Sequence, residues 1–67
     1  MKNQEDLEEL ERNALRIRTL IEIYDKTLVD DVKNEEELHI QKLKAEYLKK
    51  EILKATSMND KILRKIE

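Results

Sequence analysis

The fold of this chain is decided by residues 7–28, LEELERNALRIRTLIEIYDKTL. Apolar residues recur there at alternating intervals of three and four, the spacing that gives a helix one apolar seam for packing against another helix. Leu20 lies beside this seam and widens it, as helices in bundles require. The pattern predicts a helix over about residues 4–30. The seam consists of Leu7, Leu10, Ala14, Ile17, Ile21, Tyr24 and Leu28.

Two more apolar residues, Leu15 and Ile23, lie off this seam. A contact with a single neighbouring helix leaves no place for them, because it covers only a narrow stripe of the helix surface. Together with Leu20 they indicate that the middle of the first helix touches more than one neighbour. We therefore expect a bundle of at least three helices around residues 14–28 rather than a plain two-stranded coiled coil.

The register changes after residue 30. Continuing the first seam would bury charged residues such as Asp31 and Glu35, whereas a new register of threes and fours fits the second half. This register comprises Leu38, Ala45, Leu48, Ile52, Ala55, Ile62 and Ile66, with Gln41 and Asn59 as polar members. We expect Leu48, Ile52 and Ile62 to contribute most to packing. The change of register fits either a stammer in one continuous long helix or a real turn.

Local sequence favours a turn at about residues 31–34. Asn34 precedes Glu37 by three residues, the spacing of a capping box that opens a helix just before Leu38. The second helix is therefore predicted from about residue 35 to 55. Ser57 and Asp60 form another possible capping box, so this helix either runs on or breaks near 56–57 into a short helix over 58–66. The sequence leaves these two alternatives open.

Composition predicts one small all-α domain over residues 1–67. The chain has no Gly, Pro or Cys, and 45% of its residues are charged, a bias typical of coiled coils and long helices. A chain of this length buries a small core, and without disulfides it commonly depends on oligomerisation. We expect a helical hairpin that completes a helical bundle or coiled coil by oligomerisation, with a homodimer forming a four-helix bundle as the favoured case.

Charge divides the chain into two halves. Residues 1–37 hold six Lys and Arg against twelve Asp and Glu, a net charge of −6, and residues 38–67 hold eight against four, a net charge of +4. An acidic helix folded against a basic helix gains from this complementarity. The basic half also raises the alternative of a small nucleic-acid-associated regulator. Its lysines spread around the helix and no aromatic platform accompanies them, so nucleic acid is the less favoured partner.

Chemical motifs are few. Without Cys there is no thiol nucleophile, and without Gly there is no phosphate-binding loop, so we expect no enzyme activity and no cofactor. Glu36 and His39 have the spacing of a di-iron motif, but Glu36 stands in a first turn where capping is its natural role, so we expect no metal. No segment is apolar enough to span a bilayer or act as a signal, so we expect no membrane association and a cytoplasmic location.

These features together predict a non-enzymatic protein–protein interaction and oligomerisation module. It would be a small helical adaptor or regulator that self-associates or docks on partner helices. An excised coiled-coil segment of a larger structural protein is a further alternative. The residues expected to form the interaction seam are Leu7, Leu10, Ala14, Ile17, Leu20, Ile21, Tyr24, Leu28, Leu48, Ile52 and Ile62.

Overall fold

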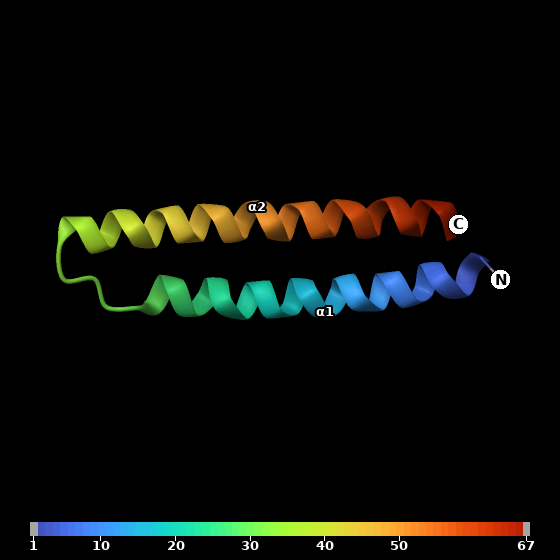
Figure 1. Ribbon diagram of the computed structural model, residues 1–67, viewed down its shortest axis with the longest axis horizontal. Helices are drawn as coiled ribbons and strands as arrows, with labels where there is room; N and C mark the ends of the chain where they lie inside the picture. The colour runs from blue at the N-terminus through green and yellow to red at the C-terminus, as the bar shows by residue number, and fades with distance from the viewer. Residues whose placement is uncertain (1, 67) are drawn as a thin grey trace.

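The computed structural model describes the backbone of residues 2–66 and the side chains of residues 4–66. It consists of two helices, α1 (Lys2–Val29) and α2 (Glu35–Ile66), which pack side by side and run in opposite directions (Figure 1). The hairpin is a rod of 54 × 14 × 12 Å, and the first residue of α1 and the last residue of α2 lie at the same end of the rod. The prediction of an all-α hairpin rather than one continuous helix is confirmed.

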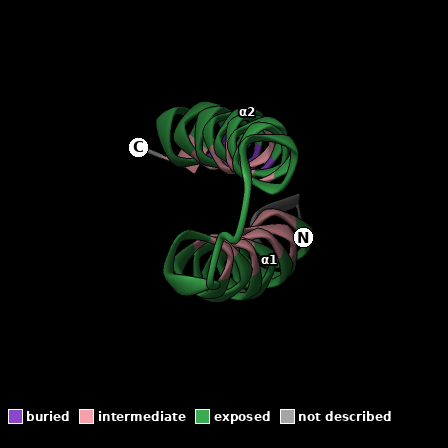
Figure 2. Cartoon of the chain, turned by 90° about the vertical axis from the view of Figure 1, so that its left-hand side faces the viewer, coloured by how far each residue is buried: buried purple, intermediate pink, exposed green. Residues whose placement is uncertain are grey.

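The inner face of α2 follows a regular seam. The intermediate and buried residues of this helix lie toward α1, and the exposed residues lie on the outside (Figure 2). Three of them, Leu48, Ala55 and Ile62, fall below one tenth exposed. The seam alternates intervals of four and three, the pattern of a helix packed against one other helix. Its members are Gln41, Ala45, Leu48, Ile52, Ala55, Asn59, Ile62 and Ile66.

The α2 helix is continuous through the region where the sequence allowed a break. Thr56 and Ser57 lie inside it, and the Thr56 hydroxyl donates to the backbone oxygen of Ile52 at 2.7 Å. Such a bond to the preceding turn lets a threonine sit within a helix without exposing an unpaired hydroxyl. The packing of Ile62 and Ile66 in phase with Leu48 and Ala55 supports a single helix here.

The start of α2 is held by the capping box around Asn34. The Asn34 Oδ1 accepts a hydrogen bond from the backbone N–H of Glu37 at 2.9 Å, and its backbone oxygen accepts from the N–H of Leu38 at 3.1 Å. The Glu37 carboxylate reaches back to the N–H of Lys33 at 2.9 Å, one residue before the cap. These bonds satisfy backbone donors that a helix start leaves free.

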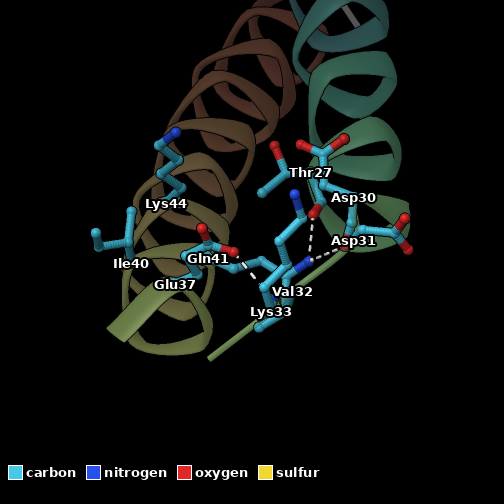
Figure 3. Close-up of a pocket in the computed structure, with 9 residues that line it drawn as sticks. All are labelled: Thr27, Asp30, Asp31, Val32, Lys33, Glu37, Ile40, Gln41 and Lys44. Atoms are coloured by element: carbon cyan, nitrogen blue, oxygen red, sulfur yellow. Dashed lines mark hydrogen bonds between the residues drawn. The ribbon is translucent and has the colours of Figure 1, made fainter. Parts of the chain in front are cut away.

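The end of α1 is capped by a side chain from α2. The Gln41 Nε2 donates to the backbone oxygen of Thr27 at 2.6 Å and to that of Asp30 at 3.3 Å (Figure 3). No residue among those described has a positive φ, so the chain turns without the left-handed residue that commonly ends a helix. Gln41 also occupies the first position of the α2 seam, so one polar residue closes the hairpin at its loop end.

Replacing Gln41 with Met removes this cap while keeping the length of the side chain. Two backbone oxygens lose their donor, and a hydrogen bond contributes about 1 kcal/mol net, so the free energy of unfolding should fall by roughly 1–2 kcal/mol. Urea denaturation followed by circular dichroism measures this change. The matched control is Lys42→Met, at the exposed neighbouring position, which should leave stability unchanged. Equal stability of the two variants would contradict the capping role.

Candidate association surface

The face that α1 turns toward α2 differs from the apolar seam predicted for it. The acidic residues Asp6 and Glu9 near the start of α1 are half-buried, and so are Asn13 and Thr27, two polar residues that occupy the same seven-residue line as Leu20. Sequence reasoning passed over Asn13 and Thr27 because they are polar, although their spacing from Leu20 is regular. From residue 10 onward, the half-buried residues of α1 are Leu10, Asn13, Ile17, Leu20, Tyr24 and Thr27.

The structure therefore divides the predicted interaction seam. Leu10, Ile17, Leu20 and Tyr24 face α2, as do Leu48, Ile52 and Ile62 on the other helix. The remaining four residues lie seven apart along one flank of α1, beside the line of Leu10, Ile17 and Tyr24. We call this line the outer stripe: Leu7, Ala14, Ile21 and Leu28. Its three large members are 55%, 43% and 51% exposed, respectively.

Helix geometry explains the division. Leu10, Ile17 and Tyr24 belong to both possible inner faces of α1, because both seams share that line of residues. A single neighbouring helix covers only that line and one more beside it. In the hairpin the second covered line is the one with Leu20, and the outer stripe stays in solvent. The covered line contains the polar residues Asn13 and Thr27, whereas the line that is left exposed is entirely apolar.

Two asparagines occupy the hairpin interior. The Asn59 Nδ2 donates to the backbone oxygen of Leu10 at 3.5 Å, a long bond. The Asn59 Oδ1 and the Asn13 Nδ2 are buried side-chain atoms with no hydrogen-bond partner among the described residues. Buried polar atoms without partners cost stability, whereas an apolar residue at the same place would gain it. The interior of the hairpin is thus only partly apolar.

The opposite side of the helix pair carries an ion pair and a groove. Arg16 of α1 lies 3.8 Å from the Glu51 carboxylate, and the Tyr47 hydroxyl donates to the same carboxylate at 3.5 Å. Beside them is an open groove of about 510 Å³ that contains Ile23, one of the two apolar residues predicted to touch additional neighbours. It is lined by Ile23, Thr27, Leu43, Lys44, Tyr47 and Leu48. Ile23 thus lies across α1 from the outer stripe.

The other candidate residues stand apart from both surfaces. Leu15 is 65% exposed, in a shallow depression that it shares with Glu8, Glu11 and Arg12. His39 is exposed, and no three His, Cys, Asp or Glu residues within 4–66 are placed to hold a metal ion. None of the described helices is both long and apolar enough to cross a membrane.

The basic residues of α2 form no single surface. Lys44 lines the groove beside Thr27, while Lys49 belongs to the opposite side of the helix. Arg64 forms an ion pair of 3.2 Å with Asp60 on its own helix. A phosphate backbone is tracked by basic residues gathered on one face. No observation in the described part of the chain favours nucleic-acid binding over the other functions.

Comparison with known proteins adds no further guide to this surface. No protein-family model matches the chain, and neither the curated proteins nor the solved structures yield a significant match.

Replacing both Asn13 and Asn59 with Leu should stabilise the hairpin. The change removes two unpartnered buried polar atoms and adds apolar surface to the interior, so the free energy of unfolding should rise by about 1–3 kcal/mol. Urea denaturation at matched protein concentration measures it. Asn34→Leu is the control, because loss of the helix cap should instead lower stability by about 1 kcal/mol. A less stable double variant would show that the asparagines find partners in solution.

Proposed function

We propose that this chain is a non-enzymatic protein–protein association module, a small adaptor or regulator that docks on apolar helices of another polypeptide through its outer stripe. The observation that carries the proposal is the rotation of α1 in the hairpin. Asn13 and Thr27 are turned toward α2, while Leu7, Ile21 and Leu28 remain about half exposed. Exposed apolar surface lowers the stability of an isolated hairpin, and a second contact that covers the stripe would remove this cost.

The size of the core supports association. Only Leu48, Ala55 and Ile62 are buried among the described residues, and none of them is completely enclosed. The hairpin exposes 5971 Å² of surface, whereas a compact monomer of 8.1 kDa would expose roughly 4500 Å². A standard protein interface covers about 800 Å² on each partner. The hairpin thus has more than enough surplus surface for one interface of ordinary size.

The length of the outer stripe suits a partner helix. From Leu7 to Leu28 it runs along the helix for about 32 Å at 1.5 Å per residue. Residues seven apart form a nearly straight line along a helix, and such a line fits the groove between side chains of a second helix. Docking along the whole stripe would complete a helical bundle in which α1 is enclosed on two sides.

Changing Ile21 to Asp tests the proposal at the middle of the stripe. Ile21 is 43% exposed in the hairpin, so the new carboxylate stays hydrated in the free chain and the fold should persist. In the assembled state it would be buried without a partner, at a cost of several kcal/mol. Two such sites in a homodimer should weaken association by at least about 100-fold. Sedimentation equilibrium measures the mass, and circular dichroism measures the helix content.

Leu15→Asp is the matched control, because it places the same charge on an exposed leucine of α1 outside the outer stripe. It should leave both mass and helicity as they are in the unmodified protein. The proposal is wrong if Ile21→Asp retains the mass and partner binding of the unmodified protein. It is also wrong if Leu15→Asp disrupts association and Ile21→Asp does not.

A further inference from the structure

Resting on the proposed function, we infer that the occupant of the outer stripe is the outer stripe of a second copy, with the two α1 helices antiparallel about a two-fold axis. Leu7 of each copy would then meet Leu28 of the other copy, once at each end of the contact. Ala14 would meet Ile21 of the second copy in the middle. Two features of this chain support the inference: α1 suits the stripe better than α2 as a docking surface, and antiparallel order suits it better than parallel order.

The side of α2 next to the stripe is a poor docking surface for it. Leu10 lies level with Asn59, and Thr27 with Gln41, which fixes how the two helices are aligned along the rod. The groove and the Arg16–Glu51 pair occupy one side of the helix pair, so the seven-residue line of α2 on the other side lies beside the outer stripe. This line consists of Lys42, Lys49, Thr56 and Leu63.

A second copy that laid this line of α2 over the stripe would bring charge onto apolar residues. If α2 of the second copy kept the alignment with α1 that holds within the hairpin, Ile21 and Leu28 would come within a turn of Lys49 and Lys42 of that copy. Two ammonium groups would be partly desolvated against aliphatic side chains, which is unfavourable even where Asp25 at the border of the stripe pairs with one of them. With stripe on stripe, every opposing residue is apolar. The chemistry of the two lines therefore selects α1 against α1.

The charges of α1 favour an antiparallel order of the two α1 helices. Within α1, residues 4–14 carry five carboxylates and one arginine, a net charge of −4, and residues 15–26 carry three basic and two acidic residues, a net charge of +1. Parallel helices would set the two acidic halves side by side and align their dipoles, whereas antiparallel helices set each acidic half beside the more basic half. The stripe is bordered by Glu11, Arg18 and Asp25. Their order of charges, negative, positive, negative, is the same in both directions, so it favours neither the parallel nor the antiparallel order.

Side-chain size points the same way. A parallel pair would stack Ala14 on its own copy and leave a gap at that level, while Ile21 would meet Ile21. An antiparallel pair sets the small residue opposite the larger one, so the volume along the stripe is more even. An interface that is its own complement under a two-fold rotation is the usual basis of a homodimer.

The experiment uses the absence of native cysteines, so that an introduced thiol is unique in the chain. Glu11→Cys and Asp25→Cys are prepared separately, both at exposed positions that border the stripe without belonging to it. The two proteins are treated alone and as a mixture with a short bismaleimide crosslinker. In the antiparallel dimer, residue 11 of one copy lies opposite residue 25 of the other, so the mixture should yield at least about five times more crosslinked dimer than either variant alone.

Two further mixtures complete the design. Glu11→Cys with Asp60→Cys reports a stripe that docks on α2, since Asp60 borders the corresponding line of that helix. Adding Ile21→Asp to both cysteine variants should abolish the crosslink, because it removes the contact. Strong crosslinking of each variant alone would overturn the antiparallel order in favour of a parallel one. Strong crosslinking in the Glu11→Cys with Asp60→Cys mixture would overturn stripe on stripe.

The failure of this inference is distinguishable from the failure of the proposed function. If the unmodified chain sediments as an 8.1 kDa monomer at every concentration tested, the second copy is not the occupant. If the crosslinks contradict the antiparallel pair while Ile21→Asp still dissociates the assembly, the arrangement is wrong and the association function stands. If Ile21→Asp changes neither mass nor binding, the association function itself fails.

Discussion

A neighbouring helix can cover only two adjacent lines of side chains on α1, yet this helix carries apolar residues on three adjacent lines, besides Leu15 and Ile23 elsewhere on its surface. One line holds Leu10, Ile17 and Tyr24 and faces α2 in any arrangement. The line on one side holds Leu20, and the line on the other side is the outer stripe. Because the hairpin can enclose only one of these two, the rotation of α1 in this structure leaves the outer stripe exposed, whereas the opposite rotation would expose Asn13, Leu20 and Thr27. The exposed apolar surface of the outer stripe follows from this constraint.

Polar residues at defined positions fix how the two helices meet. Gln41 ties the last carbonyls of α1 to the first turn of the α2 seam, and Asn59 reaches the backbone of α1 near the open end. A buried amide favours the alignment in which it finds a partner, at some cost in stability. The two contacts lie near opposite ends of the rod, so together they set the alignment of the helices along their length. With this alignment, Asn13 and Thr27 lie on the inner face and the outer stripe is exposed.

The parts of this fold that depend on neighbouring residues in the chain were predictable. The cap formed by Asn34 and Glu37 is a local pattern, and its hydrogen bond is present at 2.9 Å. The α2 seam from Gln41 to Ile66 was predictable because its polar members keep the spacing of the apolar ones, but Leu38, which was expected in the same register, is 39% exposed. The polar cap that Gln41 makes on α1 was not predicted. Its two hydrogen bonds join residues that are separated by 14 and by 11 positions in the chain, and no short sequence motif indicates such a contact.

The sequence by itself determined that the chain forms two amphipathic helices with a turn between them, because helical periodicity and capping are properties of residues close together in the chain. The tertiary structure decided which side of α1 faces α2. Leu10, Ile17 and Tyr24 fit two rotations of the helix equally well, so their spacing cannot choose between Leu20 and Ile21 as the inner neighbour. Only the packing of both helices and the contacts of their polar residues select one rotation, and that selection leaves the outer stripe exposed.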